Sequence, residues 1–390
     1  MSGFDLSSFR HEQQASRVVF GAGELHSIGA ETRRVGVERA MLISDGAAES
    51  IAATAAEELG GSIVLHWTEV IQHVPADLAG RARAVATEHE IDGVVTVGGG
   101  SATGLAKAIA LSHRVPIVAV PTTYAGSEQT PIYGVTGAAA TSEHGRVGRK
   151  ETGRDPVVQP RVVIYDPELT ATLPPHVTGP SAFNALAHSV EALYAPGCNP
   201  VTSVLALEAV RAISRALPAV LADGADLDAR AELLYGAYLS GVALGDTSAA
   251  FHHKICHVLG GTFDLVHADA HSVVLPHALA FNAPAIPAEA ARLAVALDSD
   301  DGNAAGALWD LATRSGVPTR LADLSGADGP LQRDDLELAA KRVVADVEAA
   351  GLTNPRPFGE GDVRAVLEQA FDGERPARDR SPQPNQWGKS

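Results

Sequence analysis

The pattern of hydrophobic and polar positions changes part-way along the chain. Up to Asp166, short apolar runs alternate with amphipathic stretches. The runs predict strands within residues 15–23, 39–45, 62–67, 91–97, 115–120 and 161–166, and the stretches predict helices over 47–59 and 77–90. Strands that alternate with helices of this length are typical of a parallel sheet with helices on both faces.

Beyond that point the patterns are long and helical, without a convincing strand between them. They predict helices over 181–195, 202–222, 227–243, 248–259, 268–281, 286–297, 303–315, 334–350 and 361–371. A segment with prolines at both ends, 167–175, marks the change. We therefore expect an α/β domain over 1–170, an all-α domain over 171–373, and a tail over 374–390 whose polar, proline-rich composition is typical of disorder. Residues 137–148 are expected to form an exposed loop or hairpin.

Composition narrows the class of protein. The chain has 390 residues, 45% of them hydrophobic, with 47 acidic and 30 basic side chains and a net charge of −17. A chain this acidic is not expected to bind nucleic acid or an anionic membrane through its overall field. It shows neither a membrane-spanning run nor a secretory signal, and its two cysteines suggest no disulfide framework. A cytoplasmic protein is expected.

Two predicted strands end in turns that are suited to a ligand. Glycines let the backbone approach a phosphate closely, and a following helix offers free N–H groups. The first turn holds Gly98, Gly99, Gly100 and Ser101; the second holds Thr122, Thr123, Tyr124 and Ser127. The carboxyl ends of parallel strands share one edge, where α/β proteins bind ligands. A structural tight turn, or an ordinary hydroxyl-rich loop, would use the same residues.

Histidines gather in the second half of the chain. Asn184 and His188 lie four residues apart in a helical stretch, as do His253 and His257. His267, His271 and His277 follow. Residues four apart share one helix face, which suits metal ligands, but the first histidine is not followed by the glutamate of a zinc protease. For any single histidine, a packing or surface role is the alternative.

Read together, these motifs resemble the group III, or iron-containing, alcohol dehydrogenase family. The resemblance spans about residues 15–285 and rests on VGGGSATGLAKAIAL, VPIVAVPTTYAGSE, IYDPELTATLPP, NALAHSVEALYAP and HHKICHVLGGTFDLVHADAH. The strings PTTYAGSEQTPIYGVT and GRKETGRDP resemble its maleylacetate reductase branch. This implies a Rossmann-like nucleotide-binding domain, an all-α domain of the dehydroquinate synthase-like fold, and a homodimer. It also implies reduction of maleylacetate to 3-oxoadipate with NADH or NADPH.

The resemblance carries roles to particular residues. It implies cofactor contacts at Gly99, Gly100, Ser101, Thr122, Thr123, Ser127 and Lys150, to which Gly98 of the glycine turn is added. Asp45, at the end of a predicted strand, matches the carboxylate that faces the adenosine ribose. That carboxylate would repel the 2′-phosphate of NADPH, so NADH is expected to be preferred. A plain helix cap is the alternative role for Asp45.

The expected metal site departs from the family's pattern. Metal-dependent members use one Asp and three His; the histidines match His188, His253 and His267, but the Asp position holds Asn184. A neutral amide is a poorer ligand for a hard dication than a carboxylate. We therefore expect no metal, with His253 as the main hydrogen-bond donor or acid and His257, His188, Asn184 and His267 around it.

The substrate implied by the resemblance is a dicarboxylate. By proximity to the motifs, its carboxylates are assigned to Tyr124, Arg154 and Lys254, although either cation could equally be a surface charge. A metal-dependent alcohol dehydrogenase, an inactive nucleotide-binding protein and a dehydroquinate synthase-like lyase are the alternative functions.

Overall fold

The computed structural model describes residues 9–11, 16–137, 140–142, 145–147, 150–248, 250–327 and 329–377. Its first part is a fully parallel sheet of six strands in the order β1-β10-β5-β4-β2-β3. The strands are β1 (Arg17–Phe20), β2 (Ala40–Ser44), β3 (Ile63–Trp67), β4 (Gly93–Gly98), β5 (Ile117–Pro121) and β10 (Val162–Tyr165). Each coincides with a predicted run, although β4 and β5 each extend one residue beyond it, so the expected α/β fold is confirmed.

Both faces of this sheet are covered, which explains why its strands are mostly apolar. Along β2, Met41 and Ile43 pack with α3 (Ala76–Glu88) and α4 (Gly100–His113). Leu42, between them, packs on the opposite face with α1 (Ile28–Arg34) and α2 (Glu49–Leu59). Alternate side chains of a strand point to opposite faces, so burial on both faces removes the polar positions. The short helix α1 was not predicted.

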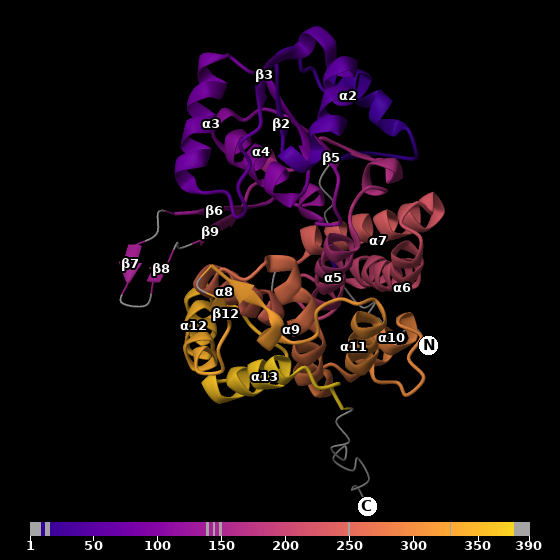
Figure 1. Cartoon of the computed structure of the whole chain (residues 1–390), viewed down its shortest axis with the longest axis vertical. Helices are drawn as coiled ribbons and strands as arrows, with labels where there is room; N and C mark the ends of the chain where they lie inside the picture. The colour runs from indigo at the N-terminus through magenta and orange to yellow at the C-terminus, as the bar shows by residue number, and fades with distance from the viewer. Residues whose placement is uncertain are drawn as a thin grey trace, which may run out of the picture.

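The second part of the chain is helical, as expected (Figure 1). Its helices are α5 (Pro175–Ala192), α6 (Pro200–Ala222), α7 (Leu227–Asp246), α8 (Phe251–Phe263), α9 (His267–Asn282), α10 (Pro287–Ala296), α11 (Ala304–Arg314), α12 (Asp335–Ala350) and α13 (Glu360–Asp372). One correction concerns strands: β11 (Ser325–Gly326) and β12 (Gly329–Pro330) form a small antiparallel pair. Two-residue strands are too short to show an alternating pattern.

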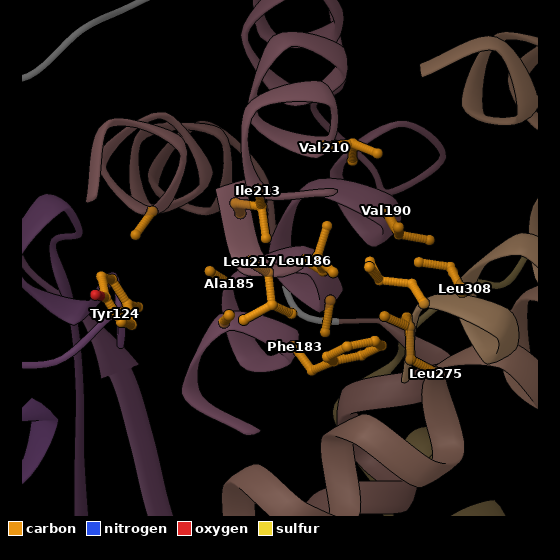
Figure 2. Close-up of a cluster of buried hydrophobic side chains, with 14 of the residues drawn as sticks. Tyr124, Phe183, Ala185, Leu186, Val190, Val210, Ile213, Leu217, Leu275 and Leu308 are labelled. Atoms are coloured by element: carbon orange, nitrogen blue, oxygen red, sulfur yellow. The ribbon is translucent and has the colours of Figure 1, made fainter. Parts of the chain in front are cut away.

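The helical core extends to the sheet. Phe183, Leu186 and Val190 of α5 pack with Leu217 of α6 and with side chains from α9 and α11. Figure 2 shows Tyr124, from the loop after β5, at the side of this cluster. Because α5 is buried nearly all round, it is held rigidly between the other helices and the sheet. The polar side chains of α5 are therefore fixed in place.

A hairpin leaves the α/β part between the strand ends and the helices. Strand β6 (Ile132–Thr136) pairs antiparallel with β9 (Lys150–Arg154), and β7 (Ala140–Ser142) pairs with β8 (Gly145–Val147) beyond them (Figure 1). The predicted hairpin over 137–148 is thus confirmed for its described residues. The expected tail over 374–390 lies outside the described residues from 378 onward. Within the described ranges, no helix is long and apolar enough to cross a membrane.

Candidate active site

The carboxyl ends of β2, β4 and β5 lie side by side and bring the two predicted turns together. The amide N–H of Thr122 donates to the carbonyl oxygen of Gly98 at 3.1 Å. A Cβ added to Gly99 would lie 3.2 Å from the side chain of Thr123, and one added to Gly98 would lie 2.9 Å from Oδ2 of Asp45. Glycine is therefore required for this close approach, and α4 begins directly after it with its N–H groups at the sheet edge.

Asp45 caps a turn at this edge of the sheet. Its Oδ1 accepts a hydrogen bond from the N–H of Ala48 at 3.0 Å, so the carboxylate caps the turn that follows β2. Oδ2 faces the Gly98 turn. The helix-cap alternative is therefore realised with one oxygen, while the other is directed toward the residues expected to hold the cofactor.

A buried lysine fixes the second turn. Nζ of Lys107, on α4, donates to the carbonyl oxygens of Ser127, Thr130 and Ile132 at 2.6, 2.7 and 2.8 Å. Burial lowers the pKa of Lys107 to about 7. These bonds tie the loop that carries Ser127 to the helix that carries Ser101, so the two turns form one rigid wall.

Histidines of α5 and α8 form the opposite wall. The ring nitrogen Nδ1 of His188 lies 2.9 Å from Nε2 of His253. Both Asn184 Nδ2 and His188 Nε2 donate to the carbonyl oxygen of Ala125, at 3.3 and 3.1 Å. Ala125 belongs to the second turn, so these bonds join the two walls. Burial, and then the neighbouring charge of His253, lowers the pKa of His188 to about 3, so its ring is neutral at physiological pH.

Gly126 allows this junction to form. Its φ of 78° is left-handed, and an added Cβ would lie 3.3 Å from the His188 ring and 3.2 Å from the Cα of Gly241. A larger residue would be strained and would push the loop away from α5 and α7. The sequence therefore sets the distance between the two walls with a glycine.

A second group of side chains lies behind the first. His252 Nε2 is 2.9 Å from Nδ1 of His271, and Nε2 of His271 is 3.0 Å from Nε2 of His267. Sγ of Cys256 is 3.7 Å from His252 Nε2. Burial lowers the pKa of His252 to about 3 and that of His271 well below its usual range. The imidazoles of His252 and His271 are therefore neutral at physiological pH.

The two walls enclose one cavity of about 560 Å³. Among the residues that line it are Gly100, Ser101, Thr123 and Ser127 from the α/β side and Asn184, His188, His253, His257 and His267 from the helical side. The structure thus brings four of the nine predicted cofactor residues and all five predicted catalytic residues to a single space. Lys150 begins β9, but its side chain lies outside the described positions.

The assignment of Tyr124, Arg154 and Lys254 to the substrate is corrected, because none of them lines this cavity. Tyr124 is fully buried, and its hydroxyl accepts a hydrogen bond from Arg230. Arg154 donates to the carbonyl oxygens of Gly245 and Thr247 at the end of α7, where unpaired carbonyls attract a cation. Proximity along the chain did not show which way these side chains point.

Two family models match the chain in succession. The model of the iron-containing alcohol dehydrogenases matches residues 15–167, and the C-terminal model of the Fe-containing alcohol dehydrogenase family matches residues 178–371. The chain belongs to the iron-containing alcohol dehydrogenase family. It is therefore an oxidoreductase, as the sequence motifs predicted.

Individual relatives agree with this membership. A maleylacetate reductase of Burkholderia cepacia is 45% identical over 95% of this chain and 100% of its own. The crystal structure of a maleylacetate reductase from Agrobacterium tumefaciens superposes with a TM-score of 0.85 at 39% identity, covering 95% of this chain and 99% of its own. The maleylacetate reductase from a Rhizobium strain gives 0.84 at 39% identity, over 96% and 100% of the two chains. The resemblance to the maleylacetate reductase branch is confirmed.

The expectation of a metal-free protein is wrong. The family is iron-containing, so membership implies a bound metal ion. Among the described residues, His252, Cys256 and His271 also form a fully buried group whose ligand atoms all lie within 4.8 Å of one another. The exchange of one carboxylate for Asn184 was too narrow a basis for excluding a metal.

The donors at the cavity fit a divalent transition metal by type. Oδ1 of Asn184 is buried and has no hydrogen-bond partner among the described residues. Neutral imidazoles, such as that of His188, keep a lone pair for a metal, and Fe²⁺ and Zn²⁺ accept imidazole readily. The residues that would hold the ion are Asn184, His188, His253 and His267, which match the family's ligand positions.

Several residues of the site were missed from the sequence, among them Lys107, His176, Glu191 and His73. Glu191 contacts His253 and lies on α5 seven residues after Asn184 and three after His188, a helical spacing that could have revealed it. His73 lines the cavity from the loop after β3. Its positive φ of 64°, shared by Val74 at 48°, has no evident signature in the sequence.

Proposed function

We propose that this enzyme reduces maleylacetate to 3-oxoadipate with NADH. The observation that carries the proposal is the single cavity lined by both the glycine-and-hydroxyl wall and the histidine wall. The names of the relatives that are 39–45% identical over nearly the whole chain support the same reaction.

The cofactor wall suits a dinucleotide. Backbone N–H groups at the start of α4 and the hydroxyls of Ser101, Thr123 and Ser127 offer hydrogen bonds to phosphate. Bound NADH supplies the hydride. We place its adenosine ribose near Asp45, whose Oδ2 faces the Gly98 turn, and this placement makes NADH the preferred cofactor.

The histidine wall suits the charge that the reaction develops. Hydride addition to a C=C bond conjugated to a ketone leaves an enolate, whose oxygen needs a positive charge or a hydrogen-bond donor. His253 is proposed as the main donor, with His257 and His188 beside it. If a divalent ion were held by the ligand set above, His253 would serve as a ligand instead of a donor, and the ion would supply a Lewis acid. Proton delivery to the enolate carbon is assigned to a histidine of this wall or to water.

The carboxylates of the substrate need local donors in an acidic protein. The described residues that line the cavity include no arginine, but they include the imidazoles of His73 and His176 in addition to the histidine wall. We propose these two rings as carboxylate contacts in place of the earlier assignment. A homodimer, which rests on the family resemblance, and a cytoplasmic location, which rests on the sequence composition, belong to the same proposal.

The deciding experiment follows NADH absorbance after addition of maleylacetate, and compares it with simple aldehydes and ketones. We expect NADH consumption with maleylacetate and formation of 3-oxoadipate. Turnover of simple carbonyl compounds in preference to maleylacetate would favour a metal-dependent alcohol dehydrogenase, which the metal-type donor set also fits. No turnover with any of these compounds would contradict both functions.

A further inference from the structure

Glu191 is a buried acidic side chain that the proposed chemistry leaves unused. It is 2% exposed and lies on α5, three residues after His188 and therefore on the same face of the helix. A carboxylate in such a place is costly unless several donors satisfy it. Its contacts therefore indicate what it is for.

The Glu191 carboxylate binds the start of α8 and one catalytic ring together. Oε2 accepts from the N–H of Ala250 at 2.9 Å, and Oε1 accepts from the N–H of His252 at 2.6 Å. These amides lie at the N-terminal end of α8, where N–H groups have no partner within the helix. Oε2 also forms a short hydrogen bond with Nδ1 of His253. One side chain thus sets both the position of α8 and the orientation of its histidine.

The hydrogen bonds of Glu191 decide which ring nitrogen of His253 carries hydrogen. Both oxygens of the carboxylate already accept backbone N–H groups, from Ala250 and His252. A carboxylate that accepts at both oxygens has no hydrogen to give to the ring, so Nδ1 of His253 is the donor in the contact with Oε2. Nε2 is then directed away from Glu191, toward His188 and the cavity.

We propose that Glu191 is a positioning residue, which fixes hydrogen on Nδ1 of His253 and thereby presents Nε2 to the cavity. The activity part of this proposal rests on the proposed function, whereas the ring geometry does not. Carboxylates that orient a histidine in this way are known to control both metal binding and proton transfer. The same contact would serve His253 as a metal ligand through the lone pair on Nε2, or as an acid when Nε2 also carries a proton.

The test uses Glu191→Gln in the full-length protein. Glutamine keeps the size of the side chain and an oxygen for the α8 amides, but it can present an NH₂ group to Nδ1, which favours the opposite tautomer. We expect kcat to fall about 100-fold, with KM and NADH affinity changed by less than about threefold. In the chelator-treated protein we expect the affinity for added Zn²⁺ to fall about tenfold or more.

NMR of protein that carries isotope-labelled histidine measures which nitrogen of the His253 ring carries hydrogen. The His253→Gln variant assigns the signal. Wild-type His253 should carry hydrogen on Nδ1, and the Gln variant should change this signal. Glu128→Gln is the matched control, because Glu128 is also a buried carboxylate with one side-chain donor, the Tyr165 hydroxyl at 2.7 Å. It should leave the His253 signal unchanged.

Two results would overturn the proposal: a wild-type His253 with no hydrogen on Nδ1, or a folded Glu191→Gln variant with the wild-type ring signal and near-normal kcat. The wild-type spectrum decides even if the variant does not fold. If wild-type protein fails to reduce maleylacetate, the NMR and Zn²⁺ measurements still test the role of Glu191. A failed function and a failed positioning role are therefore distinguishable.

Discussion

The two walls of the cavity are built on different principles. The α/β wall is made from residues that are nearly consecutive in the chain, at the ends of β4 and β5, and its key contact joins Gly98 to Thr122 across two adjacent strands. The helical wall depends on contacts between distant residues, such as His188 with His253 and His267 with His271 across α5, α8 and α9. One wall is set by backbone shape and the other by side-chain pairing.

This difference predicts how each wall responds to change. The α/β wall offers backbone N–H groups and space for the cofactor, so losing one side chain there should alter the affinity for NADH modestly. In the helical wall, the ring nitrogens of neighbouring histidines lie about 3 Å apart and Glu191 holds one of these rings, so losing one member should disturb its neighbours and the reaction itself. Mutations in the two walls should therefore differ in both the size and the kind of their effect.

The largest effect is expected for His253→Ala. The ring of His253 joins His188 to Glu191, and its loss removes the proposed donor at the reacting oxygen. We expect kcat to fall about 10²- to 10⁴-fold, the usual contribution of a positioned acid or oxyanion donor. NADH affinity, which belongs to the other wall, should change little. Steady-state kinetics with maleylacetate and a separate NADH titration measure the two quantities.

His277→Ala is the matched control for this variant. His277 is also a buried histidine of the helical part, and burial lowers its pKa to about 4, but it does not line the cavity. Its removal should reduce Tm while leaving kcat within about threefold of wild type. Near-normal turnover of His253→Ala would show that another residue is the donor, and an equal loss in both variants would indicate general damage to the fold.

The same contrast explains what could be predicted from the sequence. Most strand and helix positions followed from local periodicity, and both turns stood out because their ligand-binding residues are consecutive in the chain. The ring pairs depend on how α5, α8 and α9 pack, which no local pattern specifies. Glu191 was missed, and Arg154 was misassigned because a side chain's direction is not encoded in its distance from a motif. The domain limits at 170 and 373 stay predictions.

An effect of intermediate size is expected for substitution of Asn184, which lies where the two walls meet. In Asn184→Asp a carboxylate replaces the amide, which adds the negative charge that the family's ligand position carries. Asp cannot donate to the Ala125 carbonyl as Asn184 Nδ2 does, so the metal-free variant should be less stable. We expect Zn²⁺ or Fe²⁺ affinity to rise about 10- to 100-fold over wild type.

The rise in Tm with increasing Zn²⁺ measures the affinity of each protein for the ion, because a ligand that binds only the folded state raises Tm according to its affinity. Asn184→Ala, which lacks the ligand oxygen, should respond less than wild type. If all three proteins gave the same Zn²⁺ response, the ion would not be bound through residue 184, and the buried group of His252, Cys256 and His271 would be the next place to examine.

The smallest effect is expected in the α/β wall, at Asp45. Its Oδ2 faces the Gly98 turn, where we place the adenosine ribose, so the carboxylate should accept hydrogen bonds from NADH and repel the 2′-phosphate of NADPH. A difference of about 1.4 kcal/mol corresponds to a tenfold preference for NADH in kcat/KM. Asp45→Ser should narrow this preference, mainly by raising kcat/KM for NADPH.

Serine can still cap the turn at Ala48, as the Asp45 carboxylate does, so stability should be preserved and the change in cofactor preference should report on charge alone. The comparison requires both cofactors at the same ionic strength, since salt screens the repulsion. Equal kcat/KM for NADH and NADPH in the unmodified enzyme would leave Asp45 with its capping role only, and the backbone wall would then select dinucleotides without distinguishing their ribose.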